Sequence, residues 1–263
     1  MSEAQPDLLY EQSGPVATVT LNRPDRRNAL ALALIESLER QLAQLATDPS
    51  VRVVILAAAG PVFCSGHDLR ELATATPEQC QQLFSACARM MLTLRHLPQP
   101  VVARVQGLAT AAGCQLAATC DLVVAAETAQ FATPGLKIGL FCTTPMVPLV
   151  RVLPAKLALE MLLTAEPISA QRAREGGLVN RVVPATDLNG ATHELAQTLA
   201  RASPEVVALG KRAFYRQLPL DEAAAYDDAV PIITANATHP DAREGIAAFL
   251  EKRTPRWSQP PQP

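Results

Sequence analysis

Residues 105–117 read VQGLATAAGCQLA. This pattern predicts the end of an apolar strand, then a run of small residues, then a helix. Small side chains at the start of a helix leave its backbone N–H groups open to an incoming carbonyl oxygen. Tight packing of the helix would favour the same small residues. The glycines fit neither GxGxxG nor the P-loop pattern, which argues against a dinucleotide or nucleoside triphosphate site.

A second turn of this kind lies upstream in residues 63–69, which read FCSGHDL. Gly66 permits a tight turn, and Asp68 can cap a short helix over residues 69–73, leaving N–H groups free for a ligand oxygen. A capped turn without a ligand explains the pattern equally well. A nucleophile and base pair of Cys64 and His67 is disfavoured, because residues three apart in a turn rarely reach the required geometry.

The surrounding hydrophobic pattern alternates between strands and helices. Residues 8–10 and 16–21 predict a hairpin, residues 30–45 a helix with leucines at helical spacing, and residues 51–57 a buried strand. Such a strand, helix and strand form a βαβ unit in an α/β protein, whose parallel sheet is covered on both faces. The pattern recurs as a helix, strand, helix and strand over residues 77–96, 101–105, 111–119 and 122–126.

The C-terminal part has a different pattern. Beyond Pro184 the strand signals stop, and helices are predicted over residues 187–201, 204–216 and 241–252. These helices are expected to pack onto the α/β body or onto a neighbouring molecule. We therefore divide the chain into a core of residues 1–200 and a helical oligomerisation region of residues 201–263. The proline-rich tail of residues 255–263 is expected to be a loose end.

Composition narrows the class of protein. The 263 residues are 49% hydrophobic and 18% charged, with 23 Lys+Arg against 25 Asp+Glu, so a disordered chain is excluded. The longest basic cluster is the pair Arg26-Arg27, which makes nucleic acid an unexpected partner. Charged residues interrupt every apolar run before it could span a bilayer, so no membrane span is predicted.

The cysteines and the first residues bear on location. The six cysteines form no CxxC pair and lie in apolar stretches, which favours buried thiols in a reducing compartment and no structural zinc. Residues 1–7 are polar and show no secretion signal. From these observations a cytoplasmic protein is predicted.

The two turns, taken with their spacing, resemble those of the crotonase, or enoyl-CoA hydratase/isomerase, superfamily. The resemblance covers nearly the whole chain: LNRP at 21–24 with NAL at 28–30, residues 63–69 and 105–121, AQF at 129–131 with Pro134, and residues 249–252. It implies a spiral of ββα units with a C-terminal helical trimerisation region. Residues 132–135 and 139–145, together with residues 105–115, further resemble one subgroup of this family, assigned to fatty-acid metabolism.

The resemblance also implies a substrate and a site. The substrate is an acyl-CoA thioester, whose carbonyl oxygen lies between two backbone N–H groups. By position these oxyanion-hole donors are His67 and Ala112. Preorganised donors stabilise the negative charge that develops as an enolate forms, and one such donor is worth about 3 kcal/mol. Coenzyme A enters as part of the substrate, and no separate cofactor or metal is expected.

The sequence departs from this family pattern at the acid and base. Hydratases place one glutamate after the glycine-rich turn and a second after the proline that follows the Gln-Phe pair; here these positions hold Gln115 and Gly135. Isomerases of the family place a carboxylate a few residues after the second of these positions. In this chain that stretch is residues 139–144, which contain no Asp or Glu. A glutamine amide orients water but cannot transfer a proton near neutral pH. Because each lost group contributes about 10²–10⁴-fold, ordinary hydratase activity is doubtful.

The remaining candidates for chemistry are the side chains of His67, Glu71, Thr110, Thr133, Cys142 and Thr143. His67 alone has an ordinary pKa near neutrality and would serve as a base if its ring faced the acyl pocket. A histidine that anchors the loop is the alternative interpretation. Glu71 fits an exposed first-turn glutamate better than a catalytic one. His96, His193 and His239 lack metal-ligand spacing and are assigned no role.

Coenzyme A recognition needs cations for the phosphates. By resemblance Arg27 and Ala29 line the pantetheine and adenine side, with Arg26 near the phosphates. Phe249 and Lys252 lie about one helical turn apart and would meet the nucleotide of a CoA bound in an adjacent subunit; a core phenylalanine and a solvated lysine are the alternatives. The further substrate-binding candidates lie in and around the two turns: Cys64, Gly66, His67, Asp68, Leu69, Leu108, Thr110 and Thr133.

Three functions stay open from the sequence. The first is an acyl-CoA-transforming lyase or isomerase that keeps the oxyanion hole. The second is a non-catalytic protein that binds or senses acyl-CoA. The third is a trimer, or a dimer of trimers, that serves only as a partner for another protein.

Overall fold

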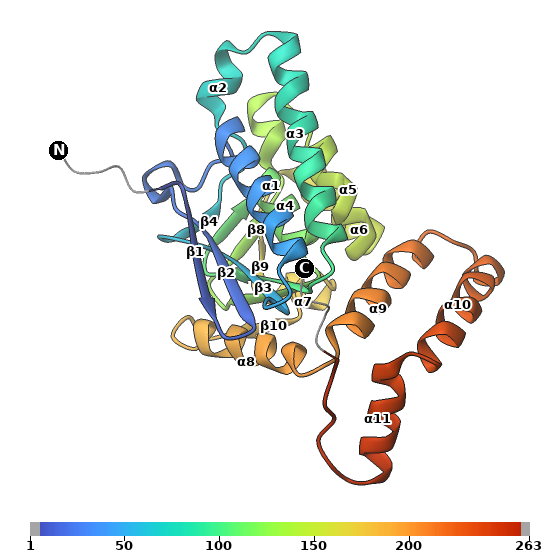
Figure 1. Ribbon diagram of the computed structural model, residues 1–263. Coiled ribbons are helices and arrows are strands. Elements are labelled where there is room, and N and C mark those ends of the chain that lie inside the picture. Colours follow the sequence, from blue (N-terminus) through green and yellow to red (C-terminus); the bar gives the residue numbers. More distant parts are fainter. Residues whose placement is uncertain (1–5, 259–263) are drawn as a thin grey trace.

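The computed structural model describes residues 6–258 of the chain as a mixed α/β fold (Figure 1). The strands are β1 (Leu8–Ser13), β2 (Val16–Leu21), β3 (Val53–Ala58), β4 (Val62–Cys64), β5 (Val101–Val105), β6 (Leu108–Thr110), β7 (Leu122–Ala126), β8 (Gln130–Ala132), β9 (Ile168–Ser169) and β10 (Arg181–Val183). The α-helices are α1 (Leu32–Thr47), α2 (Leu69–Thr74), α3 (Pro77–His96), α4 (Ala112–Thr119), α5 (Thr143–Val152), α6 (Ala155–Thr164), α7 (Ala170–Glu175), α8 (Leu188–Ala200), α9 (Pro204–Gln217), α10 (Glu222–Ala237) and α11 (Pro240–Leu250). Two 3₁₀ helices, η1 (Pro24–Arg26) and η2 (Pro134–Ile138), complete the elements.

The strands form two sheets, one of order β1-β2-β3-β5-β7-β10 and one of order β4-β6-β8-β9. The chain repeats one pattern three times: a strand of the larger sheet, then a strand of the smaller sheet, then a helix. The strand pairs are β3 and β4, β5 and β6, and β7 and β8. The repeated strands pair in parallel with the equivalent strands of the next turn. This arrangement is the spiral of ββα units that the sequence resemblance implies.

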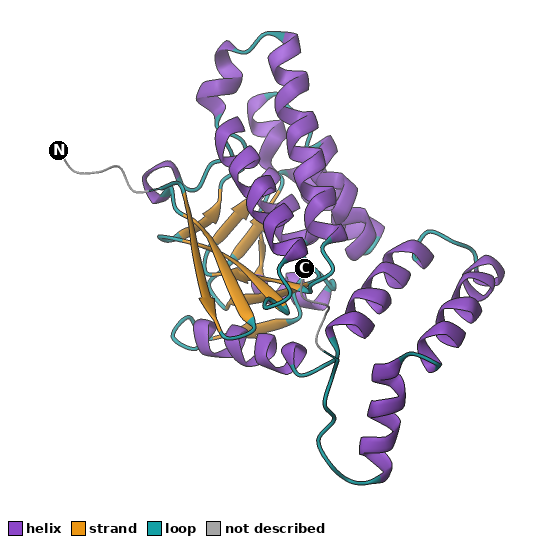
Figure 2. Ribbon diagram, in the orientation of Figure 1, coloured by secondary structure: helices purple, strands orange, loops and turns teal. Residues whose placement is uncertain are grey.

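The four inner strands of the six-stranded sheet, β2, β3, β5 and β7, are largely buried on both faces, whereas the edge strand β1 is mostly exposed. Successive side chains of β3 point to opposite faces: Val54 and Leu56 pack with α1, α3 and α4, whereas Val53 and Ile55 pack with α8. Figure 2 shows the strands enclosed between helices on both sides. The predicted parallel unit of β2, α1 and β3 is confirmed by the pairing of β2 with β3.

The predicted strands and helices of the first half correspond closely to the observed ones, and helix α3 spans the predicted residues 77–96. The sequence pattern did not predict the short strands β4, β6, β8, β9 and β10, nor helices α5, α6, α7 and α10. The short strands have three residues or fewer, too few for a periodic signal. Helix α10 contains Pro231, which interrupts the helical pattern in the sequence.

The expectation of a loose tail is wrong for residues 255–258. Trp257 Nε1 donates a hydrogen bond of 2.6 Å to the Arg201 carbonyl, and the Ser258 N–H donates one of 2.7 Å to Asp241 Oδ1. These bonds hold the segment against the end of α8 and the start of α11. The rest of the predicted tail, residues 259–263, lies outside the described residues.

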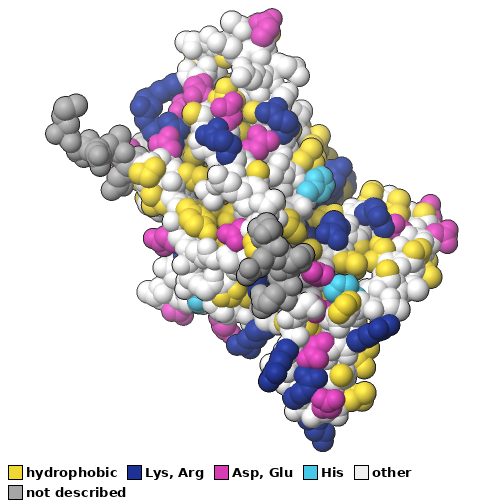
Figure 3. Space-filling view, in the orientation of Figure 1, with side chains coloured by type: hydrophobic (Ala, Val, Ile, Leu, Met, Phe, Trp, Pro, Cys, Tyr) yellow, Lys and Arg dark blue, Asp and Glu magenta, His cyan; other side chains and the backbone are white. Residues whose placement is uncertain are grey.

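The C-terminal helices α9, α10 and α11 project from the body of the molecule (Figure 1). At the base of α9, Lys211 Nζ lies 2.6 Å from Asp121 Oδ2, and Tyr215 donates a hydrogen bond of 2.8 Å to Asp121 Oδ1. Large apolar side chains on these helices are exposed, and Figure 3 shows hydrophobic side chains along the projecting part. Among them are Tyr226, Ile233, Phe249 and Leu250.

Candidate functional site

Three neighbouring strands of the smaller sheet end at the candidate site. β4, β6 and β8 pair side by side in parallel, so their carboxyl ends lie along one edge. Residues 65–67 follow β4, residues 111–112 follow β6 and residues 133–135 follow β8. Carboxyl ends of parallel strands are common ligand sites, because the loops after them converge. The two turns that the sequence analysis selected, and the Gly135 position, therefore meet.

Glycines hold the first two turns in contact. Gly66 has a φ of +92°, and a Cβ atom there would lie 2.9 Å from Ala111 Cβ and 3.4 Å from the Ala112 nitrogen. Ala111 itself has a φ of +49°, which costs an L-residue backbone strain. The Ala111 N–H donates to the Ala132 carbonyl at 2.9 Å, which anchors the strained residue to β8.

Among the backbone N–H groups at these turns, those of His67 and Ala112 have no hydrogen-bond acceptor within residues 6–258. His67 lies between Gly66, whose carbonyl accepts the Leu30 N–H, and Asp68, whose N–H donates to the Leu30 carbonyl. Ala112 is the first residue of α4, where a helix leaves its N–H groups unpaired. Asp68 caps the adjacent helix α2 by accepting from the Arg70 N–H at 3.1 Å, as the sequence predicts.

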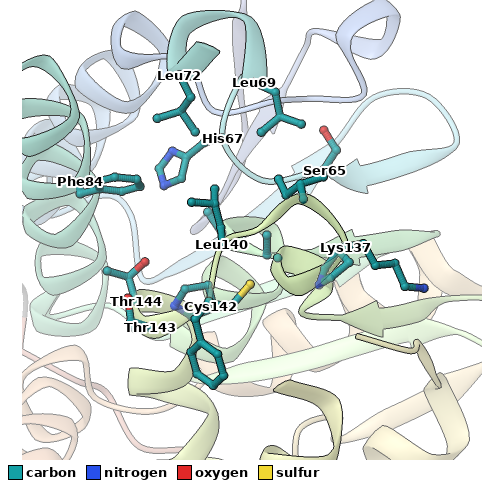
Figure 4. Close-up of a pocket in the computed structure, with 17 residues that line it drawn as sticks. Ser65, His67, Leu69, Leu72, Phe84, Lys137, Leu140, Cys142, Thr143 and Thr144 are labelled. Carbon is teal, nitrogen blue, oxygen red and sulfur yellow. The ribbon is translucent and has the colours of Figure 1, made fainter. Parts of the chain in front are cut away.

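An apolar cavity of about 470 Å³ opens beside these N–H groups. His67 and Ala112 both line it, together with Leu72 from α2, Phe84 from α3 and Leu140 from the loop before α5. Figure 4 shows the side chains of His67, Leu72, Phe84 and Leu140 around a common space. Apolar walls exclude water and strengthen any electrostatic interaction inside the cavity. A hydrophobic acyl chain would fit this environment.

The His67 ring packs edge-on against Phe84, with the ring centroids 5.2 Å apart and an interplanar angle of 83°. Neither ring nitrogen is exposed to water or forms a hydrogen bond within the described chain. Burial lowers the pKa of His67 below its ordinary value, and the nearby Leu30 carbonyl acts in the opposite direction with a smaller effect. The imidazole is therefore neutral at pH 7, with a lone pair available on one nitrogen.

The two positions where hydratases carry glutamates have different surroundings. Gln115 is buried on α4, and its Oε1 has no hydrogen-bond partner among the described residues. Gly135 lies in η2 and lines the cavity. A Cβ atom at Gly135 would lie 2.5 Å from the Leu140 carbonyl oxygen and 2.8 Å from Cys142 Sγ. The loop after η2 therefore occupies the space that a side chain at this position would need.

A second, cationic hollow of about 220 Å³ adjoins the cavity. It is lined by three arginines, Arg26, Arg27 and Arg70, against two carboxylates, Asp25 and Asp68, and also by Ala29 and Leu69. The arginines outnumber the carboxylates by one. Leu69 lines both the hollow and the apolar cavity, so the two spaces share a wall. The structure thus brings the predicted phosphate-side residues next to the predicted oxyanion hole.

Several other candidates from the sequence lie away from the cavity. Cys64 is fully buried, and burial raises its pKa to about 12, so it has no thiolate for a pair with His67. Glu71 Oε2 instead accepts the Leu32 N–H at 3.1 Å and caps the start of α1. Leu108, Thr110 and Thr133 do not line the cavity, and the buried Thr133 Oγ1 has no partner within residues 6–258. Two of the candidates, Cys142 and Thr143, differ from these because they do line the cavity.

Phe249 and Lys252 lie at the end of α11, far along the chain from the cavity-lining residues. Phe249 is 84% exposed, and Lys252 has a φ of +55° just after the helix. Neither residue lines the cavity or the cationic hollow. Within one chain the structure therefore does not bring this pair to the site.

Several residues that line the cavity have no functional signal in the sequence. Phe84 and Leu72 come from amphipathic helices, where an apolar residue is indistinguishable from core. Lys137 lines the rim, but its Nζ is 2.8 Å from Glu166 Oε1 and points away from the cavity in Figure 4. Only the packing of α2, α3 and the loop after η2 around one space identifies these residues.

Comparison with known proteins agrees with this fold. A family model described as enoyl-CoA hydratase/isomerase matches residues 11–260. The chain belongs to the enoyl-CoA hydratase/isomerase family. It is 47% identical over 258 residues to the rat mitochondrial enoyl-CoA hydratase domain-containing protein 3, covering 97% of this chain and 86% of that protein. This is the subgroup that residues 105–115, 132–135 and 139–145 resemble.

Solved structures give the same result. The crystal structure of an enoyl-CoA hydratase from Mycobacterium smegmatis matches with a TM-score of 0.94 and 47% identity, covering 96% of this chain and 99% of the other. The structure of human enoyl-CoA hydratase domain-containing protein 3 matches with a TM-score of 0.92 and 45% identity, covering 96% and 100%. The predicted spiral of ββα units is confirmed.

The prediction of a cytoplasmic location is wrong, because the similar rat, mouse and human proteins are named as mitochondrial. Composition could not have decided this, since free buried cysteines suit any reducing compartment. In the part of the chain that the structure describes, all six cysteines are free and five are buried. The same part contains no helix long and apolar enough to cross a membrane, and no cluster of three or more metal-ligating side chains.

Proposed function

We propose that this chain binds an acyl-CoA thioester of fatty-acid metabolism, with the thioester oxygen between the N–H groups of His67 and Ala112. One observation carries the proposal: both N–H groups lack an acceptor within residues 6–258 and belong to residues that line one apolar cavity. Preorganised donors in a dry cavity stabilise an oxyanion most effectively. The cationic hollow beyond Leu69 suits the phosphates of coenzyme A, which enters as part of the substrate.

Ordinary enoyl-CoA hydration is not part of the proposal. Hydration needs a water held by a base and a proton donor, and the cavity is lined by no carboxylate among the described residues. Gln115 and Gly135 supply neither group. The protein therefore either transforms the thioester with other groups, as a lyase or isomerase, or binds it without turnover.

The first experiment titrates the purified protein with crotonyl-CoA and with a longer enoyl-CoA. Calorimetry follows binding, and loss of the enoyl absorbance follows hydration in the same samples. We expect binding without hydration. Rapid hydration would contradict the interpretation of Gln115 and Gly135, and absence of binding would overturn the proposed function and favour a purely structural partner role.

The Ala112→Pro variant separates a catalytic from a binding role. Ala112 is the first residue of α4, where proline is tolerated, so the variant removes one oxyanion donor with little cost to the helix. An enzyme would lose turnover by about 10²–10³-fold with a smaller change in binding. Circular dichroism checks the fold, and Ala111→Gly serves as the matched control because it keeps the N–H groups and relieves the strained φ.

We further propose that the C-terminal helices assemble the chain into a trimer, or a dimer of trimers. The exposed apolar residues of α10 and α11 support this proposal, because monomers rarely expose large contiguous apolar patches. Assembly would also allow Phe249 and Lys252 of one chain to meet the nucleotide of a CoA bound to another. In this proposal residues 1–200 form the core of each subunit, and residues 201–263 form the region through which the subunits assemble.

A further inference from the structure

The last two projecting helices have almost no core of their own. No residue of α10 is buried, and α11 buries only Asp241 and Ala248. The position of a helix in a soluble protein usually depends on the apolar surface that it buries against its neighbours. The position of α11 relative to the body must therefore depend on other contacts.

The chain reverses after α11 and runs back along it. Lys252 has a φ of +55°, the left-handed conformation that ends many helices, and the Arg253 N–H donates to the Ala248 carbonyl at 2.9 Å. Residues 253–258, which we call the strap, then return along α11. Figure 1 shows the chain leading from the far end of α11 back to the place where α8 meets α9.

Glu244, in the middle of α11, is the first anchor of the strap. Its carboxylate accepts two hydrogen bonds from the Arg253 guanidinium, at 2.6 and 3.0 Å. It also accepts one from the Arg256 N–H at 2.7 Å. Two parallel bonds between a guanidinium and a carboxylate fix the orientation of both groups, as well as attracting them. One glutamate thus holds two residues of the strap.

Trp257 is the second anchor, and it reaches beyond α11. Its ring lies over Gly245, where an added Cβ atom would be 3.4 Å from two of the ring carbons. The absence of a side chain at Gly245 leaves room for the ring beside the helix backbone. The Trp257 Nε1 donates a hydrogen bond of 2.6 Å to the Arg201 carbonyl, just after α8. One side chain therefore joins α11 to the body.

Asp241, at the start of α11, is the third anchor. The Ser258 N–H donates to its Oδ1 at 2.7 Å, and the Ser203 hydroxyl donates to its Oδ2. Ser203 Oγ in turn accepts from the Val206 N–H at 3.2 Å and caps α9. Asp241 is 1% exposed, and loss of a hydrogen bond to a buried charged group is costly. The strap, α11 and the start of α9 meet at this carboxylate.

We infer that the strap fixes α11, with Phe249 and Lys252 at its end, in the position from which α11 binds a second copy of the chain. This inference rests on the proposed assembly through the C-terminal helices. The Phe249 residue is 84% exposed and is available to a partner. A helix that is held in place before association loses less conformational entropy when it binds. Release of the strap therefore weakens assembly even where the interface residues are unchanged.

The strap carries its own probe, because Trp257 is the only tryptophan of the chain. Its fluorescence emission and its quenching by acrylamide, measured in dilute protein, report whether the strap is docked. In Glu244→Ala we expect emission at longer wavelength and stronger quenching, because the bonds to Arg253 and Arg256 are lost. Glu222→Ala is the matched control: Glu222 is an exposed carboxylate at the end of α10 remote from α11.

Sedimentation over a range of protein concentrations measures the link to assembly. We expect Glu244→Ala to need about ten-fold more protein than the original chain to assemble, and Glu222→Ala to behave as the original chain. Circular dichroism checks the fold. Should Glu244→Ala fail to fold, Trp257→Ala replaces it in the sedimentation measurement, with the same expected result.

The outcomes separate the inference from the proposals on which it rests. Unchanged emission and quenching in folded Glu244→Ala would overturn the strap as the contact that fixes α11. A released Trp257 with unchanged assembly would overturn its role in association and leave the proposed trimer standing. An original chain that is monomeric at all concentrations would overturn both the assembly and the inferred role. Binding of crotonyl-CoA, followed by calorimetry, tests the acyl-CoA site independently of these results.

Discussion

Cys142 Sγ lies 2.8 Å from the point where a Cβ atom at Gly135 would be placed. The Leu140 carbonyl oxygen is still closer to that point, at 2.5 Å. Real Cβ atoms do not approach other heavy atoms so closely, so the loop of residues 139–142 excludes any side chain at position 135. The change from a hydratase glutamate to Gly135 is thus coupled to the path of this loop.

Gly135→Glu is expected to fail to restore hydration. The new side chain must displace a backbone carbonyl, and overpacking of this kind costs about 1–3 kcal/mol of stability. The loss of enoyl absorbance of crotonyl-CoA and thermal unfolding measure the two effects. Gly190→Ala is the control, because Gly190 has open space around it and lies in a helix. A stable, hydrating Gly135→Glu variant would contradict the argument.

Gly66→Ala is expected to weaken acyl-CoA binding more than it weakens the fold. The methyl group would meet Ala111 Cβ at 2.9 Å and push apart the two turns that carry the proposed donors. Gly14→Ala is the matched control: Gly14 also has a positive φ but no atom within 4 Å of the added methyl group. Both variants carry a backbone cost of about 1–2 kcal/mol. Calorimetry should show a loss of crotonyl-CoA affinity for Gly66→Ala only.

The stability of the protein is expected to fall as the pH drops below about 6.5, partly through His67. Burial lowers the pKa of His67 in the folded state, so the unfolded state binds the proton more readily in this pH range. The free energy of unfolding then decreases by at most about 1.4 kcal/mol per pH unit and levels off below the folded pKa. Burial raises the pKa of the Cys142 thiol, which also lines the cavity, so this thiol stays protonated throughout.

Urea unfolding of the original chain and of His67→Gln between pH 5 and pH 8 checks this prediction. The difference between the two curves isolates the contribution of His67, because all other titrating groups are shared. We expect the stability of the original chain relative to His67→Gln to fall towards low pH. Parallel curves over the whole range would show that the ring is not buried as described.

Lys211→Met is expected to destabilise the attachment of the C-terminal helices by about 3–5 kcal/mol. It leaves the carboxylate of Asp121, largely buried beneath α9, without its cation at 2.6 Å. Denaturant unfolding measures the loss. Arg172→Ala breaks an exposed pair with Glu160, also 2.6 Å long, and should cost less than about 1 kcal/mol. Similar losses in the two variants would contradict the role of burial.

Phe249→Ser is expected to weaken self-association without unfolding the chain. Phe249 is 84% exposed in a single chain, so the loss of its side chain removes little intramolecular packing. Sedimentation measurements over a range of protein concentrations should show dissociation at higher concentration than for the original chain. An unchanged oligomer, or an original chain that is monomeric at all concentrations, would contradict the proposed assembly.

Much of the fold was predictable because its signals are local. Several elements can be predicted from the residues of one segment alone. These signals are the leucine spacing of α1, the capping and length of α3, and the apolar runs of β3, β5 and β7. The strands β4, β6 and β8 have no such signal, because three residues define no period. They form by pairing with one another, and that pairing is a property of the whole spiral.

The sequence by itself determined the strand-to-helix turns at residues 63–69 and 105–117, the absence of glutamates at positions 115 and 135, and the family resemblance. Only the tertiary structure decided that Glu71 caps α1, that the space beside Gly135 is filled by Cys142, and that His67 lies unpaired on a cavity wall. The physical reason is how far apart in the sequence the interacting residues lie. Turns and helices depend on neighbours in the chain, whereas a cavity and the environment of an imidazole depend on residues that folding brings together from distant segments.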